Sequence, residues 1–220
     1  MRLARELERR LERLVDGISA TVFRGKMHPV DFANRLLRAV DLGAVDGPLG
    51  PQIDNALEVR VNPTELDVDL DMAALEHELA AAVTELTAQR GIRTGGGITV
   101  AVRMDDTVRV GSIRVDSTPA EMAMTPWAQL ISPTGRHILS IHDNRELLGR
   151  GDDADIIISH GEVSRHHALV FRTDGRAYLA DLGSVNGTAV NGVALGTNPI
   201  AIAPGDRLTF GPTTFTFRVT

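Results

Sequence analysis

The sequence contains no cysteine and no apolar run that approaches the roughly 20 residues needed to span a membrane. The absence of cysteine excludes disulfides, thiolate nucleophiles and cysteine metal ligands, and it is typical of a reducing compartment. Charged residues interrupt the apolar residues at the N-terminus, so the continuous apolar stretch of a secretory signal is missing as well. We therefore expect a cytoplasmic protein without a membrane span.

Basic residues are outnumbered, with 23 Lys and Arg against 29 Asp and Glu, for a formal net charge of −6. Nucleic-acid binding takes much of its affinity from basic side chains that neutralise phosphates, so this balance argues against a general nucleic-acid binder. The chain has 220 residues, of which 43% are hydrophobic and 24% charged. That composition is ordinary for a globular protein, and the length allows two small domains.

Helical periodicity marks three segments in the first half of the chain. Leucines within residues 1–15 recur three or four positions apart and predict an amphipathic helix. A second helix is predicted from Pro29, a favourable start residue, to Gly43, which ends the pattern. A third is predicted from the N-cap residue Asp71 to near Gly91.

Alternation with a period of two predicts strands in the same half. Apolar and polar residues alternate over 57–61, after a loop at 44–54 that is rich in Gly, Pro and Asp. Residues 98–104 and 108–116 flank an Asp-Asp-Thr turn and predict a β-hairpin. The segment 66–70 fits either a strand or a helical turn and is left unassigned. The order α-α-β-α-β-β predicts an α+β domain.

The stretch after residue 116 is poor in large apolar side chains and contains Thr-Pro twice, which is typical of a linker. We predict an N-terminal α+β domain at 1–116, a linker at 117–127 and an all-β domain at 128–220. Thr118 and Thr125 each precede a proline of the linker and are candidate phosphorylation sites.

The helical period disappears after Trp127, and short β-rich runs recur about every 8 to 12 residues. Turns in this region contain Asp-Gly or Asn-Gly pairs at 174–175, 186–187 and 191–192, which tolerate positive φ. This density of strands and turns predicts a β-sandwich or barrel.

Three loops of the β region carry residues suited to phosphate recognition: Gly149-Arg150, Ser164-Arg165-His166-His167, and the segment 181–188. Guanidinium groups can form charge-assisted hydrogen bonds with phosphate, and a serine hydroxyl can donate another. Glycines allow a ligand to approach the backbone closely. Because loops often carry function, these residues are candidates for a binding site.

The motifs G-R, S-R-x-H, D-L-x-S-x-N-G-T-x-V-N-G and G-D-x-L-x-F-G follow one another in an order that resembles the forkhead-associated (FHA) domain over residues 128–220. FHA domains are β-sandwiches whose loops at one end bind phosphothreonine peptides. The resemblance implies that Arg150, Ser164 and Arg165 contact the phosphate or the adjoining peptide. It also implies that Asn186 holds the peptide main chain. Further positions that match the family shape the binding loops: Gly149, His167, Ser184, Gly187, Asn191 and Gly192.

Val185 departs from the family pattern, since many members carry Thr or Ser at this position and gain a contact to the phosphopeptide. Losing one hydrogen bond to a charged group, worth roughly 1.5 to 3 kcal/mol, would weaken binding about tenfold or more without abolishing it. An alternative function is therefore a scaffold in which the FHA fold binds proteins without requiring phosphate.

The N-terminal half resembles the domain of unknown function that precedes the FHA domain in actinobacterial FhaA-like proteins associated with Ser/Thr kinases. The resemblance rests on residues 10–17, 23–26 and 28–30, together with the later helix and hairpin. It implies a bacterial adaptor that binds a phosphothreonine-containing kinase or kinase substrate, with a link to cell-wall synthesis. The partner of the N-terminal domain is left open.

Catalysis and metal binding are the competing interpretations. Ser164 could suggest a hydrolase, but no G-x-S-x-G motif surrounds it. The histidines show no zinc spacing, and Asp152, Asp153 and Asp155 lack the Gly and distal Glu of a calcium loop. We therefore expect a non-enzymatic protein without a cofactor or metal. The arginines of the first helix either pair with neighbouring glutamates or form a surface for an acidic lipid or partner.

Overall fold

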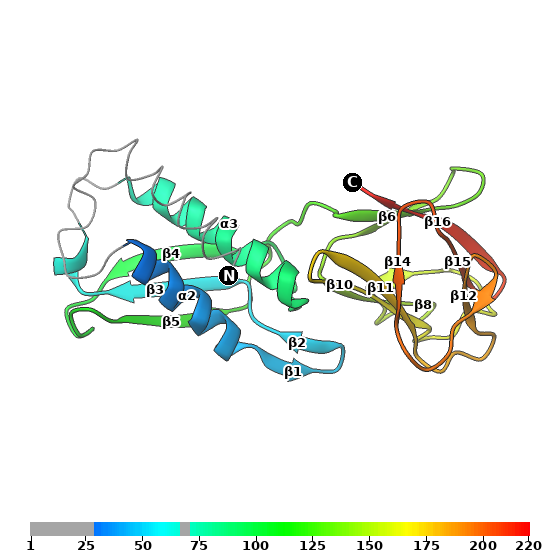
Figure 1. Cartoon of the computed structure of the whole chain (residues 1–220), viewed down its shortest axis with the longest axis horizontal. Coiled ribbons are helices and arrows are strands. Elements are labelled where there is room, and N and C mark those ends of the chain that lie inside the picture. Colours follow the sequence, from blue (N-terminus) through cyan, green and yellow to red (C-terminus); the bar gives the residue numbers. More distant parts are fainter. Residues whose placement is uncertain (1–28, 67–70) are drawn as a thin grey trace. The chain divides into compact units, whose positions relative to one another are not determined.

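The computed structural model describes residues 29–66 and 71–220, which form two compact units (Figure 1). Among the described residues, the first unit takes those up to Val45, those within Gln52–Thr87 and those of Thr94–Met122, and the second takes Asp46–Pro51, Ala88–Arg93 and Ala123–Thr220. The helix predicted at 1–15, with its basic side chains, lies outside the described residues. The predicted fold class, an α+β region followed by an all-β sandwich, is confirmed.

Two of the predicted helices are confirmed, as α2 (Pro29–Gly43) and α3 (Met72–Arg90). The N-terminus of α3 is capped by Asp71, whose Oδ1 accepts a hydrogen bond of 3.1 Å from the backbone N–H of Ala74. Its C-terminus is followed by Gly91, at a φ of 63° that favours glycine. Within the described ranges, no helix is long and apolar enough to cross a membrane.

The sheet of the first unit has the strand order β4-β3-β5 (Figure 1). Its central strand β3 (Ala56–Val61) pairs in parallel with β4 (Thr99–Met104) and antiparallel with β5 (Ile113–Thr118). The parallel pair is connected through α3, as a crossover requires. Alternate residues of β3 are buried, which gives the sheet one apolar face and one face that carries charged side chains.

The predicted β-hairpin of residues 98–104 and 108–116 is wrong, because β4 and β5 both pair with β3 and not with each other. After β4 the chain must pass across the end of β3, so residues 105–112 form a longer connection. In this loop the N–H of Gly111 donates to Glu65 Oε1 over 2.7 Å. Alternation predicts that two segments are strands, but it does not specify which strand lies between them.

Short elements occur where none was assigned. The predicted loop 44–54 contains two short paired strands, β1 (Val45–Gly47) and β2 (Gly50–Gln52). A 3-10 helix, η1 (Pro63–Glu65), follows β3 and is capped by the Asn62 side chain. The remainder of the unassigned segment, residues 67–70, lies outside the described residues.

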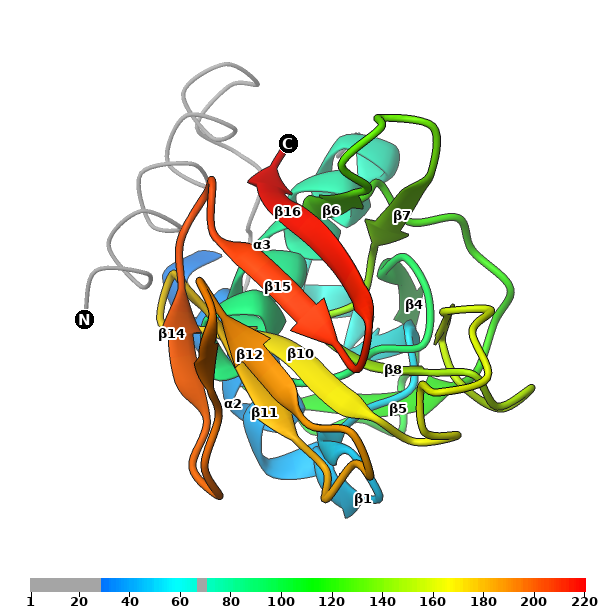
Figure 2. The same cartoon turned by 90° about the vertical axis from the view of Figure 1, so that its right-hand side faces the viewer.

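The second unit is a sandwich of two sheets (Figure 2). One sheet has the order β14-β11-β10-β8-β9 and the other has the order β13-β12-β15-β16-β6-β7. All neighbours for which the register is defined are antiparallel except β8 and β9, which are parallel. The strands are β6 (Ala128–Ile131), β7 (Ile138–Ile141), β8 (Arg145–Gly149), β9 (Ile156–Ile157), β10 (Ala168–Thr173), β11 (Arg176–Asp181), β12 (Thr188–Val190), β13 (Val193–Ala194), β14 (Ile200–Ile202), β15 (Arg207–Phe210) and β16 (Thr213–Val219).

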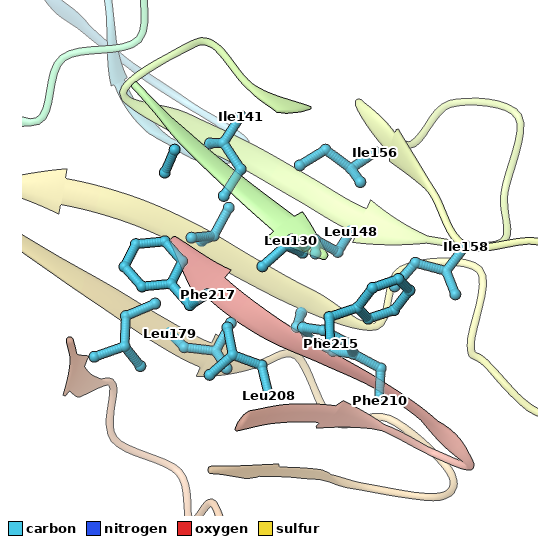
Figure 3. Close-up of a cluster of buried hydrophobic side chains, with 14 of the residues drawn as sticks. Leu130, Ile141, Leu148, Ile156, Ile158, Leu179, Leu208, Phe210, Phe215 and Phe217 are labelled. Carbon is cyan, nitrogen blue, oxygen red and sulfur yellow. The ribbon is translucent and has the colours of Figure 1, made fainter. Parts of the chain in front are cut away.

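The core of the sandwich lies between the two sheets (Figure 3). Leu148 and Leu179 enter it from one sheet, and Leu130, Phe210 and Phe217 enter it from the other; none of the five is more than 1% exposed. Burying one such side chain contributes about 1.5 to 3 kcal/mol to folding. This packing gives the loops at the ends of the strands a rigid support.

The segment between the two halves of the sequence is anchored at its N-terminal end. Strand β5 includes Ser117 and Thr118, so the first two residues of the predicted linker belong to the sheet. The side chain of Asn55 then holds Ala120, whose N–H donates to Asn55 Oδ1 over 2.9 Å. Thr125 is exposed and lies outside any helix or strand. The division at 117–127 stays a prediction.

Candidate functional site

Three loops of the sandwich meet through backbone hydrogen bonds. The N–H of Arg150, just after β8, donates to the carbonyl of Ser164 over 3.0 Å, and the N–H of Gly151 donates to the carbonyl of Arg165 over 3.2 Å. The N–H of Leu182, just after β11, donates to the carbonyl of His167 over 3.0 Å. The structure thus brings the loops that contain Arg150, Ser164 and Asn186 to the same end of the sandwich.

Ser164 lies at the centre of these contacts. Its Oγ accepts a hydrogen bond of 3.1 Å from the backbone N–H of Val185, in the neighbouring loop. A hydroxyl that accepts one bond keeps its own hydrogen for donation, and no acceptor for it lies among the described residues. The hydroxyl is therefore fixed in place by one loop and able to donate to a ligand.

His167 is a buried side chain that binds the backbone of the Ser164 loop. Its ring is completely buried and packs edge-on against Phe210, with 5.8 Å between the ring centroids. Nδ1 accepts the N–H of Ser164 over 3.0 Å, so Nε2 carries the hydrogen and donates to the carbonyl of Gly187 over 3.2 Å. The imidazole thus bonds to the backbone of Ser164 and not to its hydroxyl, which is the arrangement of a brace between two loops.

Asp181 organises the third loop from its first residue. Oδ1 accepts the N–H groups of Gly183 and Ser184, while Oδ2 accepts the hydroxyls of Ser184 and Thr188 over 2.6 and 2.5 Å. Burial alone would raise the pKa of this carboxyl, but the hydrogen bonds from Ser184, Thr188 and Gly183 outweigh it and lower the pKa below its ordinary value. The loop is therefore held in one conformation before any ligand binds.

The two arginines predicted at the site are exposed. Neither the Arg150 nor the Arg165 guanidinium forms an ion pair with a carboxylate in the part of the chain that the structure describes. Asp153 is nearby, but it is bonded to His166, with 2.6 Å between Oδ2 and Nε2. That hydrogen bond lowers the pKa of Asp153, and Arg165 adds a smaller effect. The donors of both arginines remain available for an anion.

Asn186 connects two of the loops. Its Nδ2 donates to the carbonyl of Glu162 over 2.8 Å, while the side chain as a whole is exposed. Its Oδ1 has no partner among residues 29–66 and 71–220, so this oxygen can accept a hydrogen bond from another chain. The role predicted from the family, holding a peptide main chain, requires such a free amide group.

Gly149 allows the loops to pack closely, because a Cβ atom at this position would overlap the backbone carbonyl of Arg165. Gly187 adopts a φ of 74°, which an L side chain rarely adopts. The other predicted turn residues, Asn191 and Gly192, lie at the opposite end of β12, where Asn191 Nδ2 bonds Asp206 Oδ1 over 2.8 Å. The structure therefore does not place them with the three loops.

Several residues of the site were not predicted. The acceptor role of Asp181, the carbonyl of Glu162 and the pair of Asp153 with His166 emerge only from the structure. A signal existed for Asp181, since an aspartate followed by Ser three positions later is typical of a turn in which the side chain accepts backbone N–H groups. No group of three or more His, Asp or Glu side chains in the described ranges could hold a metal.

The fold and the convergent loops define the second unit as an FHA domain, and the sequence model of the FHA domain family matches residues 147–211. The model described as FhaA, N-terminal domain matches residues 4–116, just over half of the chain. The chain therefore belongs to the family of proteins with this N-terminal domain.

Individual relatives match less than half of the chain. The ABC transporter ATP-binding/permease protein Rv1747 of Mycobacterium tuberculosis is 37% identical over 94 residues, which cover 43% of this chain and 10% of that protein. The chain thus spans about a tenth of the length of this relative. A crystal structure of the FhaA FHA domain, complexed with the intracellular domain of Rv3910, is 29% identical, covers 41% of this chain and 99% of that chain, and has a TM-score of 0.38. An FHA domain from a study of phosphothreonine-dependent interactions is 29% identical, with coverages of 42% and 96% and a TM-score of 0.39.

Proposed function

We propose that the chain is an adaptor whose FHA domain binds a phosphothreonine peptide through Arg150, Ser164, Arg165 and Asn186. The observation that carries the proposal is the Ser164 hydroxyl, which accepts the Val185 N–H and keeps its hydrogen for a ligand. Arg165 follows Ser164 in the sequence, and the backbone N–H of Arg150 donates to the carbonyl of Ser164. The guanidinium groups of both arginines are exposed and form no ion pair with the described residues. A dianion satisfies all three groups at once.

Phosphate fits this arrangement for chemical reasons. It carries a charge of about −1.5 to −2 near pH 7 and offers three acceptor oxygens, which suit a hydroxyl and two guanidinium groups. Arginine also remains charged at any relevant pH and can bind phosphate with two parallel hydrogen bonds. The free Oδ1 of Asn186 accepts from the main chain of the bound peptide, so the site recognises both the modification and the chain that carries it.

The partner that this chemistry fits is a phosphothreonine-containing Ser/Thr kinase or kinase substrate. A bacterial signalling role agrees with membership of the FhaA N-terminal domain family. The link to cell-wall synthesis stays a prediction from that resemblance. Phosphorylation of the chain itself also stays a prediction: Thr118 lies in a strand, whereas Thr125 is exposed outside the strands. The geometry of the site favours binding over catalysis, because His167 does not face the Ser164 hydroxyl.

The decisive experiment compares two peptides that differ only in phosphorylation of one threonine. Their affinities are measured by fluorescence anisotropy for the wild type, Arg150→Ala and Ser164→Ala. Arg176→Ala is the matched control, because this exposed arginine begins β11 whereas the site lies after its end. We expect the wild type and the control to bind only the phosphorylated peptide, and the two site variants to lose most of that binding.

Equal binding of both peptides by the wild type would contradict the proposal. It would select the phosphate-independent scaffold, which the valine at position 185 makes the relevant alternative. A loss of binding in Arg176→Ala equal to that in Arg150→Ala would show that only general positive charge matters, and this too would contradict a specific site.

A further inference from the structure

Val185 is the most exposed of the large hydrophobic side chains in the described residues, at 88%. Isolated exposed apolar residues are common on protein surfaces, so exposure alone shows nothing. The position of Val185 is different, because its backbone N–H is bonded to the hydroxyl that the proposed function assigns to the phosphate. A phosphate that accepts from this hydroxyl would therefore lie beside Val185.

The loop around Val185 is rigid enough to present this side chain in a defined place. The four hydrogen bonds to Asp181 hold residues on both sides of it, from Gly183 to Thr188. The next residue, Asn186, is in turn bonded to Glu162. Val185 therefore lies between the phosphate donor Ser164 and the amide that would hold the peptide main chain.

We propose that Val185 is a specificity-determining residue, and that the bound peptide places an aliphatic side chain against it, at a position flanking the phosphothreonine. This inference rests on the proposed function. A phosphate bonded to Ser164 and a main chain bonded to Asn186 require the peptide to cross Val185 between the two contacts. A flanking Val, Leu or Ile side chain covers most of the exposed valine, whereas a polar side chain loses its hydration there without gaining a partner.

The experiment uses a library of phosphothreonine peptides in which each flanking position carries in turn Leu or Ser. The full chain is tested as the wild type, Val185→Thr and Val193→Thr. Threonine has nearly the shape of valine, so the variant changes polarity and not size. Val193 is the matched control because it is 71% exposed and lies beyond the other end of β12.

We expect the wild type to prefer Leu over Ser by about tenfold at one flanking position, as burial of most of an aliphatic side chain implies. The ratio should fall close to one in Val185→Thr and stay unchanged in Val193→Thr. The ratio is used because Val185→Thr can also gain a hydrogen bond that alters the affinity for every peptide alike.

Two outcomes overturn the inference alone: phosphate-dependent binding with no aliphatic preference at any position, or a preference that Val185→Thr leaves intact. A third outcome, equal binding of phosphorylated and unphosphorylated peptides by the wild type, overturns the proposed function together with the inference. The unphosphorylated control peptide separates these cases.

Discussion

Charged side chains pair with one another in the sheet of the first unit, whereas the two arginines predicted at the site of the sandwich form no such pair with the described residues. In the sheet, Arg60 contacts Glu58 at 2.6 Å and Arg114 contacts Asp116 at 3.5 Å. In the sandwich loops, Arg150 and Arg165 form no ion pair with the described residues. The charges of these sheet arginines are neutralised within the fold, whereas those of Arg150 and Arg165 remain available to a ligand.

The strand register explains the pairing in the sheet. Arg60 lies opposite Arg114, and Glu58 lies opposite Asp116, so each row across the strands carries charges of one sign. Like charges opposite each other repel, and contacts between the rows relieve that repulsion. The hydrogen bond that the Arg60 guanidinium donates to Glu58 raises the pKa of Arg60 accordingly. These arginines neutralise carboxylates of the same sheet.

The carboxylates show the same contrast. Glu58 and Asp116 face arginines, while Asp181 is satisfied by hydroxyl and backbone donors. Glu146 is only 6% exposed, and its Oε1 accepts the N–H groups of His142 and Asp143. Its Oε2 has no partner in the described part of the chain. Asp181 and Glu146 of the sandwich thus accept hydrogen bonds from hydroxyl and backbone donors and not from arginines.

The largest effect predicted from this contrast concerns the unpaired arginine. Arg150→Ala should weaken phosphothreonine-peptide binding by about 2 to 5 kcal/mol, because it removes a charged partner from a bound dianion. Arg60→Ala should leave that affinity unchanged. Isothermal titration calorimetry with one phosphopeptide checks both, and similar losses in the two variants would contradict the contrast.

A second prediction concerns Glu146, whose burial raises its pKa to about 7 from an ordinary value of 4.5. Because folding raises the pKa of Glu146, protonation of this side chain favours the folded state. Its contribution to the free energy of unfolding is fully present below the unfolded pKa and is lost as the pH rises from about 4.5 through about 7. The shift corresponds to at most about 3 kcal/mol. We expect Glu146→Gln to remove this dependence, so that the variant gains on the wild type at alkaline pH.

Urea unfolding at several pH values, followed by fluorescence of the single tryptophan, Trp127, measures this difference. Trp127 packs edge-on against Phe217 in the sandwich and so reports on its unfolding. Glu162→Gln is the control, since Glu162 is exposed. A difference between wild type and Glu146→Gln that is constant with pH would show that Glu146 titrates normally.

A third and smaller effect is predicted for Asp181→Asn. The amide replaces one carboxylate oxygen with a donor, so either the two N–H groups bonded to Oδ1 or the two hydroxyls bonded to Oδ2 lose their acceptor. We expect the sandwich to lose about 1.5 to 3 kcal/mol of unfolding free energy, the range for a hydrogen bond to a charged group. Chemical unfolding monitored at Trp127 checks this, and an unchanged midpoint would mean that the loop does not depend on Asp181.

The smallest effect is expected for the paired charges of the sheet. Arg60→Ala should leave the urea midpoint of unfolding within experimental scatter, because exposed ion pairs contribute little and are screened by salt. Measurements at low and high salt sharpen the test. A clear destabilisation that persists at high salt would show that the arginine contributes through packing.

Much of the fold followed from local chemistry in the sequence. The starts and ends of α2 and α3 were predicted from Pro29, Asp71 and Gly91, because caps and glycines act over a few residues. The pairing of β4 and β5 with β3 was not predicted, since it depends on contacts between residues more than 40 positions apart. The order of the FHA motifs predicted which loops would meet.

The sequence could not predict which polar groups are satisfied within the fold. Arg60 and Arg150 are the same residue type, and only the neighbours of Arg60 in space show that its charge is neutralised. The burial of Glu146 and the bond from Asn186 to Glu162 are likewise tertiary facts. The exposure of Val185 is another, and it turns a departure from the family pattern into a testable basis for peptide selection.

The hydrogen bonds around Asp181 have a kinetic consequence. A loop that is already ordered does not have to fold around an arriving peptide, so encounter and electrostatic attraction set the association rate. Peptides that differ only in their flanking residues should then associate at similar rates. Selectivity would reside in the lifetime of the complex, and a preferred partner would be one that leaves slowly.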